Sequence, residues 1–451
     1  MSPADTIAAI ATAPGRGGVG IVRVSGERAP AISQGVIGRI PPPRQATLAT
    51  FVDASGAAID SGLALHFPAP GSYTGEHVVE LQGHGSPAAL RALLARVVEL
   101  GARVAEPGEF TRRAFLNGKL DLVEAEAVAD LIEAATATAA RAAARSLTGE
   151  FSARIHAVVD EVTELRMILE ASLDFPEEDV GFVRAADFER RLGVVLQTLD
   201  GLLRAARTGA RLRDGLVVVL AGPPNVGKSS LLNALVRHEA AIVTDIPGTT
   251  RDTVERPLDL AGVPVTLVDT AGLRATDDRV EQLGIARTRE ALARADLALV
   301  LVDARDREGV VADTHVDAAI PAGIPRIVVH NKTDLAQLPA RAEVREHATH
   351  VWISALHGNG VPELERAILA VADVDVAGED TFIARERHVV ALREAAQRAR
   401  GALEHVVHPA AALELVAEEL RECQAALASI TGEFTADDLL GVIFSRFCIG
   451  K

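Results

Sequence analysis

The chain has 451 residues and a formal net charge of -16 at pH 7, from 62 acidic and 46 basic side chains. One ordinary hydrophobic core does not organise a chain of this length, so several domains are expected. The acidic balance opposes loose, charge-driven adhesion to nucleic acid, and any RNA substrate would need a local basic patch or a basic partner. The two cysteines, Cys423 and Cys448, are too few for a disulfide scaffold or a four-cysteine metal site.

Two further features of the composition narrow the class of protein. No apolar run is long enough to span a bilayer, and the first residues lack the basic start and apolar stretch of a signal peptide. We therefore expect a cytoplasmic protein without stable membrane insertion. Lysine is rare beside arginine, so we expect a lysine to remain where the forked, bulky head of arginine cannot substitute. The lysines are Lys119, Lys228, Lys332 and Lys451.

Residues 1–118 are typical of a mixed α/β domain. Alternating apolar and polar residues at 21–24 and 78–81 predict strands, and Gly and Pro clusters separate these stretches. Residues 87–100 predict a helix.

Residues 119–213 and 374–451 are predicted to be helical. In the first segment, apolar residues recur along one helix face from Phe151 to Leu169; the pattern breaks at 174–178 and resumes near Ala185. Residues 214–373 instead alternate strands and helices, beginning with the apolar run 216–220, as in a parallel sheet covered on both faces. We predict a multidomain α/β and all-α protein whose discontinuous helical domain carries an inserted α/β domain.

The inserted domain begins with a phosphate-binding motif. Residues 222–229 read GPPNVGKS between an apolar strand and a helical pattern, which is the setting of a P-loop. Its backbone amides would wrap the phosphates, Lys228 would reach the β and γ oxygens, and Ser229 would coordinate Mg²⁺. An isolated glycine turn is the alternative, but three further motifs follow in order. The expected contacts of this loop are Asn225, Val226, Gly227, Lys228, Ser229 and Ser230.

The second and third motifs would sense the γ-phosphate. Thr250, in Thr249-Thr250-Arg251-Asp252, can offer a hydroxyl to Mg²⁺ and an amide to the γ-phosphate. Asp269 follows a predicted strand at 265–268 and would support the metal. The expected nucleotide contacts are Thr250, Asp269, Thr270, Ala271 and Gly272.

The fourth motif predicts guanine recognition. Asp334, in Asn331-Lys332-Thr333-Asp334 after the strand 327–329, can accept two hydrogen bonds from the guanine ring N–H and amino group. Adenine offers neither in that arrangement, and such a site rejects the wrong base by on the order of 10⁴. The nucleotide is therefore GTP rather than ATP. The expected contacts are Asn331, Lys332 and Asp334, with Ser354, Ala355 and Leu356 closing over the base.

The hydrolytic machinery must differ from that of Ras-type proteins, in which a glutamine after the third motif orients the attacking water. The corresponding residue is Leu273, which can neither donate nor accept. Glu281 is a candidate to place the water; a solvated surface carboxylate is the alternative. The Asn225 side-chain carbonyl could help to hold a monovalent cation beside the phosphates, or Asn225 could be an ordinary turn residue.

With these motifs in hand, the whole chain resembles the MnmE (TrmE) family of tRNA-modification GTPases. The most specific segments are 13–21, 80–85, 115–121 and the terminal Cys448-Ile449-Gly450-Lys451. The resemblance implies a domain at 1–118 that dimerises and binds folate, a helical domain split between 119–213 and 374–451, and a Ras-like GTPase domain at 214–373.

The resemblance also implies that potassium replaces an arginine finger. The ion would be held by Asn225 with Thr244, Ile246 and Thr249, and Glu281 matches the water-orienting glutamate of the family. The segment carrying the last three potassium ligands joins the expected GTP contacts as Thr244, Asp245, Ile246, Pro247, Gly248 and Thr249.

Family members act with an FAD-dependent partner of the MnmG (GidA) type, which the resemblance implies in a heterotetramer with a homodimer of this chain. Together they add an aminomethyl or carboxymethylaminomethyl group to the wobble uridine of certain tRNAs, using a one-carbon unit from tetrahydrofolate. The positions matching the site for 5-formyl-tetrahydrofolate or a related folate are Arg23, Glu80, Lys119 and Lys451. Cations suit the folate carboxylates, and Glu80 can bind the pterin N–H edge. Cys448 matches a terminal cysteine considered a catalytic thiol, with a small buried hydrophobe as the alternative.

Two other functions fit parts of the sequence. A regulatory GTPase of ribosome assembly would use GTP only as a timer, but it predicts an RNA-binding module, and we find no KH-type Gly-X-X-Gly segment in a suitable setting and no basic tail. A structural hub that only holds other proteins is the second alternative, but it gives no role to the N-terminal glycine loops or to the CIGK end.

Overall fold

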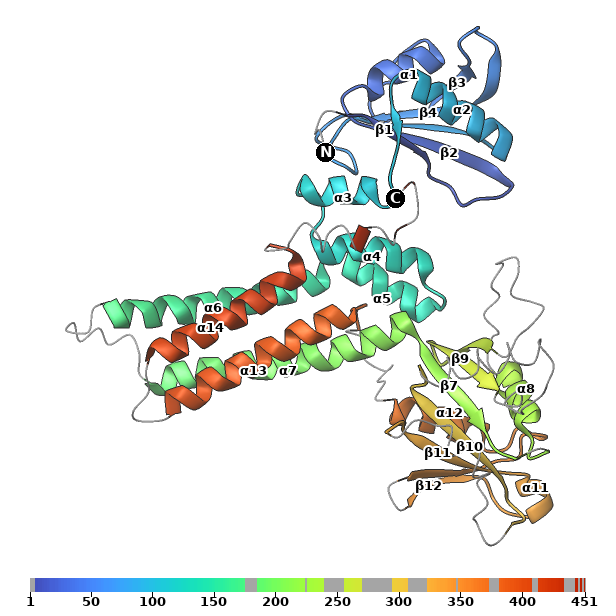
Figure 1. Cartoon of the computed structure of the whole chain (residues 1–451), viewed down its shortest axis with the longest axis vertical. Coiled ribbons are helices and arrows are strands. Elements are labelled where there is room, and N and C mark those ends of the chain that lie inside the picture. The colour runs from blue at the N-terminus through green and yellow to red at the C-terminus, as the bar shows by residue number, and fades with distance from the viewer. Residues whose placement is uncertain are drawn as a thin grey trace, which may run out of the picture. The chain divides into compact units, whose positions relative to one another are not determined.

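The computed structural model describes residues 5–174, 185–223, 225–238, 255–269, 294–306, 323–345, 348–372, 381–407 and 413–433, with residues 443, 444, 447 and 450. The chain forms two compact units (Figure 1). One comprises residues 1–129, 147–164 and 421–451, and the other comprises 130–146 and 165–420.

The first unit contains a six-stranded sheet in the order β3-β4-β5-β2-β1-β6. All neighbouring strands are antiparallel except β1 and β6. Two helices, α1 (Ala29–Ile37) and α2 (Pro87–Glu99), share one core with the apolar side of the sheet. The predicted strands at 21–24 and 78–81 and the predicted helix at 87–100 are confirmed. The strands are β1 (Ile7–Ile10), β2 (Gly17–Ser25), β3 (Thr47–Val52), β4 (Ala58–Phe67), β5 (Val78–Gly85) and β6 (Arg103–Val104).

The helix α3 (Glu109–Leu116) follows the sheet, and α4 (Leu122–Glu133) comes next. Leu122 and Ala125 of α4 form a small core with Phe444 and Phe447 from the end of the chain. Phe444 and Phe447 are therefore packed against the first turn of α4. The predicted long helix through Phe151 is α6 (Glu150–Asp174), and the other long helix that reaches this unit is α14 (Leu413–Thr431).

The second unit contains the helices α5 (Ala137–Leu147), α7 (Ala185–Asp214) and α13 (Glu386–Val407). Helix α7 begins at the residue where the sequence predicts that helix resumes. Helices α7 and α13 lie side by side in opposite directions (Figure 1), and Arg400 donates to Asp200 across them at 2.5 Å.

The nucleotide-domain sheet of this unit has seven strands in the order β12-β13-β11-β10-β7-β9-β8. The five central strands are parallel, whereas the edge strands β8 and β12 pair antiparallel with their neighbours. The expected fold class, an α/β domain inserted in a helical domain, is confirmed. The strands are β7 (Leu216–Ala221), β8 (Glu255–Leu260), β9 (Val263–Asp269), β10 (Leu297–Asp303), β11 (Arg326–Asn331), β12 (Arg341–Arg345) and β13 (Ala348–Trp352).

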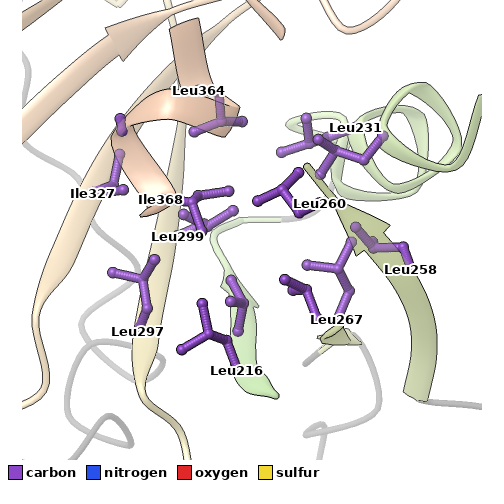
Figure 2. Packing of buried hydrophobic residues seen from close by; sticks show 14 of the residues in the cluster. Leu216, Leu231, Leu258, Leu260, Leu267, Leu297, Leu299, Ile327, Leu364 and Ile368 are labelled. Atoms are coloured by element: carbon purple, nitrogen blue, oxygen red, sulfur yellow. The ribbon is translucent and has the colours of Figure 1, made fainter. Parts of the chain in front are cut away.

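One face of this sheet packs on the helices α8 (Lys228–His238) and α12 (Val361–Val371). Figure 2 shows Leu231 of α8 and Leu364 and Ile368 of α12 against leucines of the central strands, among them Leu216 and Leu299. Burying such side chains supplies the main stabilisation of the domain and fixes the carboxyl ends of β7, β10 and β11 at one edge. The phosphate-binding loop leaves the sheet at this edge.

Candidate nucleotide site

The P-loop connects β7 to α8, and two of its glycines are required by close approaches. Gly227 has φ +105°, and a Cβ built there would lie 2.2 Å from Nδ2 of Asn331. Gly222 has φ +145°, and its Cβ would lie 2.6 Å from the carbonyl oxygen of Leu301. Any side chain at these positions would displace the neighbouring strand ends or the loop itself. The glycines therefore let the loop fold tightly against β10 and β11.

Asn331, at the end of β11, joins two of the predicted nucleotide loops. Its Nδ2 donates to the carbonyl oxygen of Val226 at 2.8 Å, and its Oδ1 accepts from the backbone amide of Ala355 at 3.0 Å. The residue is only 2% exposed. Because both ends of one buried amide are used, the P-loop and the loop at 354–356 are held at a fixed separation.

Lys332 forms the second brace. Its Nζ donates to the backbone oxygen of Asn225 at 2.8 Å and to Oδ2 of Asp303 at 2.9 Å. Asp303 ends β10, and its pKa lies well below the ordinary value, first because of its hydrogen bond from Arg305 and also because of that from Lys332. The sequence interpretation missed Asp303. Its signal was a carboxylate at the end of an apolar strand that neighbours the P-loop strand.

Asp334 is oriented by the loop that the sequence predicts to close over the base. Its Oδ1 accepts from Oγ of Ser354 at 2.7 Å, and Ser354 is fully buried. The neighbouring Leu356 is 76% exposed, so its side chain is free to cover a ligand. A carboxylate fixed in this way presents a defined acceptor edge, which base discrimination requires.

Lys228 lies within the curve of the P-loop. Its Nζ donates to the carbonyl oxygens of Gly222 at 2.7 Å and Pro223 at 3.0 Å. Ser229 and Ser230 are exposed in the first turn of α8. Helix N-termini carry unpaired amides and partial positive charge, so this turn suits phosphate and its metal.

Other predicted residues of this site lie outside the described residues or at their limit. Asp269 ends β9, where it pairs with Leu220 next to the P-loop. The predicted residues outside the described ranges are Thr244, Asp245, Ile246, Pro247, Gly248, Thr249, Thr250, Thr270, Ala271, Gly272, Glu281, Cys448 and Lys451.

A second cluster lies on the N-terminal sheet. Arg23 and Glu80 are partners in the β2–β5 register, and Nε of Arg23 donates to Oε1 of Glu80 at 3.0 Å. The Arg23 guanidinium lies 5.6 Å from the ring centroid of Tyr73 and 5.7 Å from that of Phe110. Its Nη1 also donates to the backbone oxygen of Gly450 at 3.5 Å. The fold thus pairs two predicted folate residues and brings one of them, Arg23, to Gly450.

Lys119, the third described residue of that prediction, is exposed just after α3. A Cβ on Gly75 would lie 3.4 Å from its Cγ, so the lysine stem lies along the loop that precedes β5. Burial raises the pKa of Tyr73 in the same loop, which favours the neutral phenol. Among the described residues, no helix is long and apolar enough to cross a membrane.

Comparisons with known proteins agree over the whole chain. The family described as "GTP-binding protein TrmE N-terminus" matches residues 6–119, and the family "MnmE helical domain" matches residues 122–448. The tRNA modification GTPase MnmE of Ralstonia nicotianae is 56% identical, covering 99% of this chain and 96% of that protein. The protein of the same description from Nitrosomonas europaea is 54% identical over the full length of both chains.

Among solved structures, the FeoB G-domain from Methanococcus jannaschii is 26% identical over 34% of this chain and 96% of its own, with a TM-score of 0.25. The family assignment rests on the relatives that match over the full length. With both family matches and more than half of its residues identical to theirs, the chain belongs to the MnmE (TrmE) family of tRNA modification GTPases.

Proposed function

We propose that this chain binds GTP with Mg²⁺ and hydrolyses it in the course of tRNA modification. The observation that carries the proposal is the double brace of the P-loop, in which Asn331 holds Val226 and Lys332 holds Asn225. Asp334, fixed by Ser354, supplies guanine selectivity. The chain's family membership supports the same reaction. Steady-state GTP turnover with ATP as a competitor tests it: ATP should not inhibit, and equal competition by ATP would contradict the proposal.

We propose further that the hydrolysis depends on potassium. Asn225 is exposed in the P-loop with φ +60°, and its backbone oxygen is held by Lys332, which leaves its side-chain carbonyl available to a cation. Thr244, Ile246 and Thr249 would complete the ion's ligands. Because Leu273 cannot orient water, Glu281 takes that role in the proposal, and the potassium charge stabilises the transition state.

The N-terminal cluster is proposed to bind 5-formyl-tetrahydrofolate or a related folate. Arg23 and Glu80 place a cation and an acceptor on adjacent strands, beside the ring of Tyr73, which suits a molecule with carboxylates and a planar N–H edge. Lys119 and Lys451 are proposed to add positive charge. Calorimetric titration of the full chain with 5-formyl-tetrahydrofolate tests this site, and absence of heat at millimolar ligand would count against it.

The covalent chemistry is proposed to need two partners. A homodimer formed through residues 1–118 would bind an FAD-dependent protein of the MnmG (GidA) type in a heterotetramer, in the cytoplasm. The complex would add the (carboxymethyl)aminomethyl group to the wobble uridine of certain tRNAs. Cys448 is proposed to supply a thiol for this chemistry. Mass analysis of tRNA nucleosides from a deletion strain tests both points. Complementation with the wild-type chain tests the uridine modification, and complementation with Cys448→Ser tests the thiol.

We propose domain limits of 1–118, 119–213, 214–373 and 374–451, with nucleotide-driven movement passed to the helices. The contact that supports this coupling joins the residue before α5 to the β8–β9 turn, where Oγ1 of Thr136 donates to the carbonyl oxygen of Gly262 at 2.7 Å. In the sequence, β8 follows Thr250 and β9 ends at Asp269, so this turn joins the two phosphate-sensing motifs. Distances between spin labels on the two nucleotide domains of a dimer should change during GTP turnover, and constant distances would contradict coupling.

A regulatory GTPase of ribosome assembly remains the alternative, and folate binding separates the two functions. The tRNA-modifying protein binds the folate and supports the uridine modification. A timer GTPase does neither.

A further inference from the structure

The carboxylate of Asp303 sits beside the ammonium group that braces the P-loop. Oδ2 of Asp303 accepts from Nζ of Lys332 at 2.9 Å, and the same Nζ donates to the backbone oxygen of Asn225 at 2.8 Å. The side chain of Asp303 is 14% exposed and that of Lys332 is 26% exposed. The pair is thus largely shielded from solvent, where an ionic hydrogen bond is stronger than at an open surface.

Two backbone contacts fix the position of the Asp303 backbone. Asp303 and Asn331 are partners in the parallel register of β10 and β11, and the amide of Ala304 donates to the carbonyl oxygen of Asn331 at 2.8 Å. The backbone of Asp303 therefore stays beside the segment that contains Lys332, and this position does not depend on the Asp303 side chain. The Asp303 side chain is thus presented to Lys332 from the end of the sheet.

Arg305 is the second partner of Asp303. Its Nε donates to Oδ1 of Asp303 at 2.9 Å and its Nη2 donates to Oδ2 at 2.7 Å, so one guanidinium spans both carboxylate oxygens. The side chain of Arg305 is 54% exposed, and its guanidinium binds Asp303 from the solvent side. The two partners of Asp303 therefore differ in their other surroundings. Lys332 also contacts the P-loop, whereas Arg305 faces solvent.

We propose that Asp303 is a positioning residue of the nucleotide site. By holding Nζ of Lys332 against the backbone oxygen of Asn225, it keeps the P-loop in the left-handed conformation at Asn225, from which the Asn225 side chain would reach the monovalent cation. The inference rests on the proposed potassium-dependent GTPase function for its cation part. Its nucleotide part requires only that GDP binds the P-loop.

Asp303→Asn tests the proposal, because the amide keeps the shape of the side chain and removes its charge. The Kd for a fluorescent GDP analogue should rise about tenfold, as expected for weakening one charge-assisted hydrogen bond. The potassium concentration for half-maximal GTP turnover should rise by a similar factor, whereas kcat at saturating GTP and potassium should stay within about threefold of wild type. A role confined to folding would lower the melting temperature without moving the potassium requirement.

Arg305→Ala is the matched control, since it removes the other partner of Asp303 and leaves Lys332 in place. We expect its GDP affinity and potassium requirement to stay within about threefold of wild type. Asp303→Glu keeps the charge but displaces it by one methylene, so it should shift both quantities less than Asp303→Asn does. It also provides the test if Asp303→Asn does not fold.

Two results would overturn the proposal. One is a folded Asp303→Asn chain, or a folded Asp303→Glu chain if the amide variant does not fold, with wild-type GDP affinity and a wild-type potassium requirement. The other is an Arg305→Ala chain that reproduces the full effect. Equal GTP turnover of the wild-type chain in potassium and sodium would instead contradict the proposed function, while GDP affinity measured in sodium would still test Asp303.

Discussion

Asp130 and Arg385 lie 255 positions apart in the sequence and form an ion pair, in which Nη2 of the arginine donates to Oδ1 of the aspartate at 2.9 Å. Nε of Arg213 donates to the same oxygen at 2.8 Å. Arg213 lies just before the nucleotide domain and Arg385 just after it. One buried carboxylate of α4, 3% exposed, therefore fastens both chain connections of the inserted domain.

Asp130→Asn should lower the free energy of unfolding of this unit by about 2–3 kcal/mol, because it removes the buried charge that accepts ionic hydrogen bonds from Arg213 and Arg385. Urea unfolding followed by circular dichroism measures the change. Asp200→Asn is the control, since its pair with Arg400 is exposed on both sides and should be worth less than about 1 kcal/mol. Equal effects of the two variants would contradict the proposed role of Asp130 in holding both chain connections of the inserted domain.

Asp334→Asn should change the preferred base. The amide replaces one acceptor of the carboxylate by a donor, which opposes the amino group of guanine and suits the carbonyl that xanthine carries at the same position. We expect GTP affinity to fall by at least about 100-fold while xanthosine triphosphate affinity rises. Competition for a fluorescent GDP analogue measures both changes, and an unchanged preference would remove Asp334 from the base site.

Asn331→Ala should weaken nucleotide binding by about 30-fold or more, because it breaks the bonds to Val226 and Ala355 and leaves both backbone groups without their partner. The expected loss is in affinity for both GTP and GDP. Leu356→Ala provides a comparison on the same loop, since an exposed side chain contributes contact area rather than support. A larger loss for Leu356→Ala than for Asn331→Ala would contradict the assigned roles.

The ring of His330 makes stability depend on pH. It stacks on the ring of Trp352, with centroids 4.3 Å apart and planes 8° from parallel. Burial, and next the positive charges of His350, Arg345 and Arg341, lower the pKa of His330 from 6.5 to about 4. The unfolded chain therefore binds more protons than the folded chain between these values.

The stabilisation is fully present above pH 6.5 and is lost as pH falls towards 4, by at most about 2 kcal/mol for a half-buried ring. His330→Phe keeps an aromatic ring and removes the proton site, so its melting temperature should fall less between pH 6.5 and 4.5. Because Trp352 is the single tryptophan of the chain, its fluorescence follows this unit directly. Parallel pH profiles for both proteins would show that other groups cause the loss.

Glu80→Ala should weaken folate binding by about tenfold or more, since it removes both the acceptor and the ion pair that orients Arg23. Asp60→Asn is the matched control: this carboxylate also lies on the N-terminal sheet, but its partner is the exposed ring of His84. Calorimetric titration measures both. A loss of equal size in the two variants would indicate a change in the sheet rather than in a binding site.

Local sequence patterns predicted the elements with strong periodicity and strict motifs. The P-loop and the start of α7 at Ala185 came from such signals, because glycine positions and apolar spacing are local properties. Helix α3 and strand β12 were missed. The five residues of β12, Arg341–Arg345, do alternate charged and apolar side chains, but the run is short and mostly charged, and β12 exists because it pairs with β13. Asp130 and Asp303 were missed for the same reason, since each acts through residues that only the fold brings near.

The most direct measurement is steady-state GTP hydrolysis by the full-length chain in potassium and in sodium at equal ionic strength, with Mg²⁺ and excess ATP present. The account predicts GTP hydrolysis that ATP does not inhibit, with a kcat at least about tenfold higher in potassium, because the cation stands in for a positive charge at the transition state. Equal turnover in the two salts, or no hydrolysis in either, would contradict it.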